Sequence, residues 1–231
     1  MSSFKKVFNI ILHDAEKLAL EALMRIAKDH PKTKMVFDSV KNAQCRKLHF
    51  HNWENVLLGV KFVHEAVTCP HMRDTAIVAI LFKDYSFNPF SPVHKLHSAH
   101  LCFDLLSEVL LISKGISEDI KRAILRVEPP KLRSKKLSDL DKIVMDVSFI
   151  RLASTSGVFW DITKLLLKEK GLPETPKSFN IRARYFTQNF PMTLSQNPLP
   201  IFLSESAQPY QDMARVNIKA FLRACKTGNF Q

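Results

Sequence analysis

Glycine is scarce in this sequence, at 5 of 231 residues. Phosphate-wrapping loops of the Walker or dinucleotide-binding kind need several glycines close together. The sequence therefore excludes both loops, and a bound phosphate would have to be held by other donors. The chain also has no run of about 18 apolar residues, the length that a membrane-spanning helix needs, so we expect no membrane span.

Closely spaced cysteines are absent as well. The four cysteines are far apart in the chain and include no Cys-x-x-Cys pair: Cys45, Cys69, Cys102 and Cys225. This usage favours reduced core thiols over a disulfide framework or a zinc knuckle. We therefore expect a cytoplasmic, reducing environment.

Apolar residues recur at helical spacing along nearly the whole chain, and no run of strict alternation typical of a strand is found. Over 4–28, Asp14 and Lys17 interrupt the apolar pattern, so we expect an amphipathic helix packed on a core and no signal peptide. A membrane-surface helix is the alternative for this segment. Further helices are predicted over 52–67, 70–84, 93–114, 117–127, 137–153, 158–170, 179–190 and 206–226. The sequence predicts a single all-α domain over 1–231.

Capping residues and prolines mark the expected helix boundaries. Helix starts are predicted at Pro70, Ser117 and Ser138, and helix ends at Gly115 and Gly171. Loops are predicted over 128–137, 171–178 and 191–209.

The formal net charge of +12 and the pI of about 9.6 predict attraction to something acidic, whether nucleic acid, nucleotide, anionic membrane or acidic protein. The densest basic cluster consists of Lys121, Arg122, Arg126, Lys131, Arg133, Lys135 and Lys136. A solvated loop and a phosphate or nucleic-acid contact are both open for this cluster. It lacks the interleaved aromatic residues of single-strand binders, so nucleic acid is not the favoured partner.

Two carboxylates lie in strongly apolar surroundings. Asp84 follows Lys83 directly after the apolar run 76–82, and Asp146 lies within the predicted helix 137–153. A buried carboxylate is costly unless a cation or hydrogen-bond donors meet it. We therefore expect each aspartate to have a partner.

Histidines gather at two places. His51 and Asn55 are four residues apart and are predicted to share a helix face, whereas His49 and His51 by spacing alone fit either metal ligands or ordinary loop and cap residues. The second group lies in the stretch HKLHSAH and consists of His94, His97 and His100. For these histidines, a solvated face or a pocket wall is favoured over a dedicated ion site.

Taken in order, five stretches resemble the HD superfamily of metal-dependent phosphohydrolases, over about residues 46–225: RKLHFHNWENV, DTAIVAILFKDYSFNP, HKLHSAHLCF, KIVMDVSFIRLAS and DMARVNIKAFL. The resemblance rests on their order and spacing. It implies an HD-domain-like helical bundle in which two histidines and two aspartates hold a divalent metal that activates water for attack on a phosphate ester.

The resemblance places the metal ligands on His51, Asp84 and Asp146. Lys83 stands where the family has a ligand histidine, and Lys95 stands where it has a glutamate. A protonated lysine cannot coordinate a metal. We therefore hypothesise that Lys83 replaces the metal by neutralising the carboxylates itself.

Other positions depart from the family or keep its pattern. Ser148 replaces a second acid, and 125–129 has no counterpart of an expected Thr-His pair. The pair Ser98-Ala99 is kept, and so is an Ala-Arg-x-Asn element over 214–217, for which we expect a role in helix packing and hydrogen bonding.

These departures favour a non-catalytic binding or interaction protein with a basic pocket for a phosphorylated small molecule or an acidic protein. The predicted ligand-binding residues are His49, Asn55, Lys95 and His97. One alternative is a divergent phosphohydrolase acting on a nucleotide or another phosphate ester, with Lys83 and Asp84 as catalytic groups and a weakly bound Mn²⁺ or Mg²⁺. The other is a nucleic-acid-binding helical protein.

Overall fold

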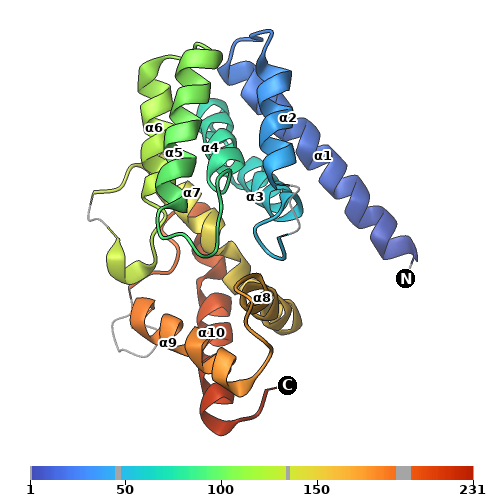
Figure 1. The fold of residues 1–231 in the computed structure, drawn as a ribbon, viewed down its shortest axis with the longest axis vertical. Helices are drawn as coiled ribbons and strands as arrows, with labels where there is room; N and C mark the ends of the chain where they lie inside the picture. Colours follow the sequence, from blue (N-terminus) through green and yellow to red (C-terminus); the bar gives the residue numbers. More distant parts are fainter. Residues whose placement is uncertain (1, 45–47, 134–135, 191–198, 231) are drawn as a thin grey trace. The chain divides into compact units, whose positions relative to one another are not determined.

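The computed structural model describes residues 2–44, 48–133, 136–190 and 199–230, with the side chains of the first helix described from residue 12 (Figure 1). Cys45, Lys135 and residues 191–198 of the predicted loop 191–209 lie outside the described residues. The α-helices are α1 (Ser2–Ile26), α2 (Thr33–Gln44), α3 (Trp53–Ala66), α4 (Pro70–Phe82), α5 (His94–Asp104), α6 (Lys114–Leu125), α7 (Asp139–Phe149), α8 (Ser156–Glu169), α9 (Pro176–Asn189) and α10 (Gln211–Thr227). No strand is found in the part of the chain that the structure describes, so the predicted all-α class is confirmed.

Short helical segments extend several of these helices. The π-helix Leu105–Val109 follows α5, and the 3₁₀ turn Ile150–Ala153 follows α7. The 3₁₀ turn Pro130–Leu132 lies in the predicted loop 128–137, and the 3₁₀ segment Glu205–Tyr210 leads into α10.

The chain divides into two compact units, an N-terminal unit over Met1–Leu125 and a C-terminal unit over Arg126–Gln231. Each unit has its own buried core. That the two together form one domain stays a prediction.

Helix α4 forms the centre of the N-terminal unit, where it packs against α1, α3, α5 and α6. Residues 76–82 are buried without exception. A helix that is apolar on every side is stable only when neighbours cover all of it. Helix α1 supplies one cover through a small-residue face at Ala15, Ala19 and Ala22, so the predicted packing of this helix is confirmed.

Helix α2 was not among the predicted helices, and leaving it out was wrong. It buries Val36, Phe37 and Val40 on one face, and the Phe37 ring meets the Trp53 ring edge-on at 5.7 Å. These residues are spaced by one and three positions, which is one helix face. The apolar face is only three residues long, which is why the longer neighbouring patterns hid it.

Three predicted helix boundaries are confirmed. Pro70 is the first residue of α4, and Ser138 caps α7 through a capping box with Asp141. Gly171, with a φ of 67°, follows α8 and donates its N–H to Lys168 O at 2.9 Å.

The predicted boundary between 115 and 117 is wrong. Gly115 and Ser117 both lie inside α6, which begins at Lys114. The preceding helical segment ends earlier, and Leu111 takes the left-handed conformation there with a φ of 54°. Glycine fits the first turn of a helix without strain, so the presence of Gly115 did not require a helix to stop.

Aromatic side chains form much of the core of the C-terminal unit. Phe221 of α10 lies 5.7 Å from Phe186 of α9 and 6.1 Å from Phe159 of α8, measured between ring centroids. Asn217 of α10 donates to Leu152 O at 2.8 Å and to the backbone carbonyl of residue 154 at 2.7 Å. The helix-packing role predicted for the 214–217 element is therefore confirmed for Asn217.

Among the described helices, none is by itself long and apolar enough to cross a membrane, although the bent pair Asp139–Ala153 and Ser156–Glu169, with 111° between its parts, meets that test of length and composition when taken together.

Candidate functional site

Lys83 and Asp84 lie at the C-terminal end of α4, in the N-terminal unit. Lys83 caps the helix by donating its N–H to Ala79 O at 3.0 Å, and the chain then turns, with Phe87 N–H donating to Asp84 O at 3.0 Å. The two side chains are only 14% and 11% exposed, and the Lys83 ammonium forms a hydrogen-bonded ion pair with Asp84 Oδ2. The partner expected for the Asp84 carboxylate is therefore its sequence neighbour.

Two histidines flank one aromatic ring beside this pair. The His51 ring stacks on Phe87 at 3.7 Å with 18° between the ring planes, and His94 approaches the same phenyl ring at 4.7 Å and 60°. His94 Nδ1 lies 2.7 Å from Ser91 O, which fixes that imidazole. The half-buried Phe87 ring therefore contacts both imidazoles.

Positive charge keeps Asp84 ionised. Burial acts to raise the pKa of Asp84, but the Lys83 ammonium and the nearby His51 and His94 outweigh it and lower the pKa below its ordinary value. The structure thus brings together three of the predicted site residues, His51, Lys83 and Asp84.

The predicted shared helix face of His51 and Asn55 is wrong. Asn52 caps α3 by accepting a hydrogen bond from Asn55 N at 3.0 Å, so His51 precedes the helix. The Asn52 amide also donates to His49 O at 3.3 Å. An asparagine ahead of a helix favours the cap over a further helical turn, because its side chain satisfies a free N–H of the first turn.

The remaining predicted ligand-binding residues lie on α5. Lys95 is half-buried, and His97 is exposed. Between the next turns, buried Ser98 accepts a hydrogen bond from Ser86 N at 2.9 Å. The Ser98-Ala99 pair thereby ties the turn after Asp84 to α5.

Asp146 belongs to the C-terminal unit and is fully buried in α7. Its carboxylate accepts hydrogen bonds from Leu203 N at 2.9 Å, Ser204 N at 2.6 Å and Ser204 Oγ at 2.7 Å. Burial raises the pKa of Asp146, and the donors on Ser204 and Leu203 together with Arg133 oppose that rise only in part. The partner expected for this aspartate is therefore a backbone segment.

The divalent metal implied by the family resemblance does not fit these donors. Lys83 already occupies the Asp84 carboxylate, and both oxygens of Asp146 accept hydrogen bonds. Over the described ranges, no group of three or more His, Cys, Asp or Glu side chains is arranged to hold a metal ion.

Two arginines of the predicted basic cluster, Arg126 and Arg133, make contacts within the C-terminal unit. Arg133 donates to Pro200 O at 2.8 Å and to Ile201 O at 2.5 Å, and burial lowers its pKa to about 10 although Asp146 opposes that shift. Arg126 pairs with the buried carboxylate of Asp141 at 2.8 Å. These contacts leave fewer cations for nucleic acid than the sequence suggests.

The cysteines divide between core and surface. Cys102 is buried, which raises its thiol pKa, so the core-thiol prediction is confirmed for this residue. Cys69 is exposed, directly before Pro70, and the core-thiol prediction is wrong there.

A cavity of about 440 Å³ between α8 and α10 was missed by sequence reasoning. Small residues and one tryptophan line much of it, at positions that sequence spacing does not connect. Comparisons of the chain with family models, with curated proteins and with solved structures gave no match.

Proposed function

We propose that the chain is an HD-like helical protein that works by binding and without a metal ion. The observation that carries the proposal is the ion pair between Lys83 and Asp84 at the end of α4. The lysine stands where the resembled family has a metal ligand, and its charge meets the carboxylate that would otherwise need a cation.

Electrostatics explains how one lysine serves this purpose. Two opposite charges at about 4 Å attract by roughly 4 kcal/mol at an effective dielectric of about 20, so the ammonium stabilises the buried carboxylate without an ion. A divalent ion activates a bound water, and the resulting hydroxide attacks the phosphate ester. A lysine ammonium cannot generate this hydroxide. The same substitution therefore favours a binding role over hydrolysis.

The ligand class follows from the charge around Asp84. Lys83, His51 and His94 surround a single carboxylate, so the cluster is net positive when the imidazoles are protonated. The whole chain carries +12. Both features favour an anionic ligand, either a phosphorylated small molecule or an acidic protein segment.

Metal content tests the central claim. After dialysis with Mn²⁺, we expect no ion in the wild type and about one per chain in Lys83→His, which restores the ligand type of the resembled family. Asp84→Ala is the matched control in both backgrounds. A stoichiometric ion in the wild type that Asp84→Ala removes would overturn the proposal, and an ion-free Lys83→His would show that Lys83 is not what excludes the metal.

The phosphohydrolase alternative draws on the proximity of His51 and Asp84, two residues that the resemblance assigns to a metal site. Turnover of para-nitrophenyl phosphate and of nucleotides with added Mn²⁺ or Mg²⁺ distinguishes it. We expect no phosphate release above that of Asp84→Ala.

Ligand binding distinguishes the remaining readings. Titration with a nucleoside monophosphate and with the matching nucleoside, in wild type and in Lys83→Met, should show phosphate-dependent binding that the variant loses. A steep salt dependence of affinity for DNA or RNA would instead support the nucleic-acid reading.

A further inference from the structure

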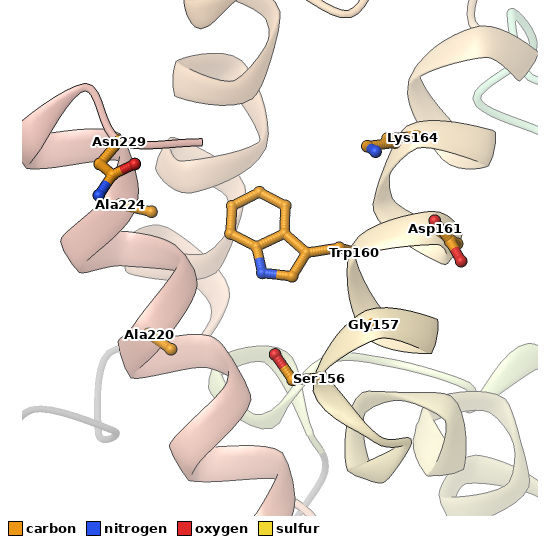
Figure 2. Close-up of a pocket in the computed structure, with 8 residues that line it drawn as sticks. All are labelled: Ser156, Gly157, Trp160, Asp161, Lys164, Ala220, Ala224 and Asn229. Atoms are coloured by element: carbon orange, nitrogen blue, oxygen red, sulfur yellow. The ribbon is translucent and has the colours of Figure 1, made fainter. Parts of the chain in front are cut away.

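The cavity between α8 and α10 lies wholly within the C-terminal unit (Figure 2). It is open to solvent, with Ser156, Asp161 and Asn229 exposed at its edge, and its volume of about 440 Å³ falls within the roughly 300–1,000 Å³ of small-molecule sites. The lining residues are Ser156, Gly157, Trp160, Asp161, Lys164, Ala220, Ala224 and Asn229.

Small side chains on both helices leave this space open. Gly157 of α8 and Ala220 and Ala224 of α10 line the cavity, and a Cβ built on Gly157 would meet no atom within 4 Å. The Trp160 indole reaches from α8 toward α10 and contacts the Phe221 ring at 5.0 Å and the Phe179 ring at 5.9 Å. Buried aromatic neighbours therefore hold the indole in place, and the cavity is preformed.

Two hydrogen-bond donors in this cavity lack protein partners. Within the described part of the chain, no residue accepts a hydrogen bond from the Trp160 indole N–H, and no carboxylate pairs with the Lys164 ammonium. The indole N–H is not among the buried polar atoms that lack a partner, so it is accessible to solvent and free to donate to a bound ligand. Lys164 and Trp160 both extend toward α10, whereas Asp161 lies farther from that helix (Figure 2).

The two donors lie at different ends of the indole. In the view of Figure 2, Lys164 lies toward the six-membered ring of the indole, and the ring N–H lies toward Ser156. The flat indole between them offers a stacking surface. The surrounding unit carries 17 basic against 9 acidic side chains, so its charge also favours an anion.

We propose that this cavity binds a small aromatic anion, such as an arene carboxylate or sulfonate. The ligand's ring lies against the Trp160 indole, its anionic group pairs with Lys164, and the indole N–H donates to an acceptor at the opposite end. This proposal does not depend on the Lys83–Asp84 pair, and it is unaffected by whether that pair replaces a metal.

Fluorine NMR of para-(trifluoromethyl)benzoate with the full chain tests the proposal, with para-(trifluoromethyl)benzamide as the neutral match. We expect the benzoate to bind about fivefold more tightly than the benzamide, because its carboxylate pairs with the partly exposed Lys164 ammonium. Lys164→Gln should weaken benzoate binding by about the same factor. Lys168→Gln, one turn along α8 and outside the cavity lining, should leave it unchanged.

A second pair of variants tests the location without removing a donor. Ala220→Leu should block binding by filling the cavity, and Gly157→Leu should do the same from the opposite helix. Circular dichroism melting checks that each variant is folded. If Ala220→Leu does not fold, Gly157→Leu provides the test. The proposal is overturned if the benzoate does not bind, if both lysine variants lose affinity equally, or if a folded cavity-filling variant still binds.

Discussion

Ser204 donates both its backbone N–H and its hydroxyl to one carboxylate oxygen of Asp146, at 2.6 and 2.7 Å. Leu203 N donates to the same carboxylate at 2.9 Å. Because Asp146 is fully buried in α7, these hydrogen bonds hold the segment that contains Leu203 and Ser204 against α7. The aspartate that the family resemblance assigns to metal binding thus does structural work in this chain.

Removing that carboxylate should be costly. Asp146→Ala leaves the N–H groups of Leu203 and Ser204 without an acceptor, and each such group costs about 1–3 kcal/mol. We expect a loss of about 3 kcal/mol in the free energy of unfolding, measured in urea, and about 1 kcal/mol for Ser204→Ala. Asp161→Ala, an exposed acid on α8, is the control and should change stability by less than about 0.5 kcal/mol. Equal losses in Asp146→Ala and Asp161→Ala would contradict this role.

Replacing only Lys83 should destabilise the protein more than replacing both Lys83 and Asp84. Lys83→Met leaves an unpaired carboxylate that is only 11% exposed, and breaking a buried pair costs about 3 kcal/mol or more. The double variant Lys83→Met/Asp84→Leu should recover most of this loss, because no buried charge remains. Chemical denaturation at neutral pH measures both. A single variant as stable as the wild type would show that Lys83 is not what stabilises Asp84.

Glu16 makes the stability of the N-terminal unit pH-dependent. Burial raises its pKa, but hydrogen bonds from Lys41 and from the Trp53 indole outweigh burial and lower it below 4.5. A carboxylate with a lowered folded-state pKa stabilises the fold above its unfolded pKa, and this contribution is lost as the pH falls through the folded pKa. The wild type should therefore exceed Glu16→Gln in melting temperature at pH 6, and the difference should shrink below pH 4.5. A pH-independent difference would rule out this linkage.

Leu111 and Gly171 both have left-handed backbone conformations, so exchanging leucine for glycine and glycine for alanine should have opposite effects on stability. Leu111 has a φ of 54° and is exposed, so Leu111→Gly should stabilise the protein by about 1 kcal/mol by relieving left-handed strain. Gly171 has a φ of 67°, so Gly171→Ala should destabilise by a similar amount although the added methyl meets no atom within 4 Å. Thermal melts of both variants check the signs, and a destabilised Leu111→Gly would show that the leucine side chain outweighs the strain.

Burial energetics predicted more of the site than spacing did. The cost of an unpaired carboxylate foretold partners for Asp84 and Asp146, and both have them. Spacing predicted that His51 lies on a helix, but Asn52 is the N-cap of α3, so the helix begins after His51. The partner of Asp84 is its sequence neighbour Lys83, which was predicted, whereas the partner of Asp146 depended on where the chain folds back, so Ser204 was not predicted.

Local signals also explain which parts of the fold were predicted. The apolar run of α4 was long enough to be recognised, whereas the three-residue apolar face of α2 was not. Gly115 was interpreted as a helix end, although glycine also fits a first turn and the left-handed position fell on Leu111. The cavity beside Trp160 comes from small residues on two separate helices, and only tertiary packing brings these together.

The chain's two tryptophans divide between the two units, with Trp53 in the N-terminal unit and Trp160 in the C-terminal one. Each unit therefore carries its own intrinsic fluorophore, and Trp53→Phe or Trp160→Phe leaves a single reporter. Coincident unfolding transitions from the two single-tryptophan proteins would mean that the halves fold as one cooperative body. Separate transitions would mean that the half with Lys83 and the half with the cavity unfold independently.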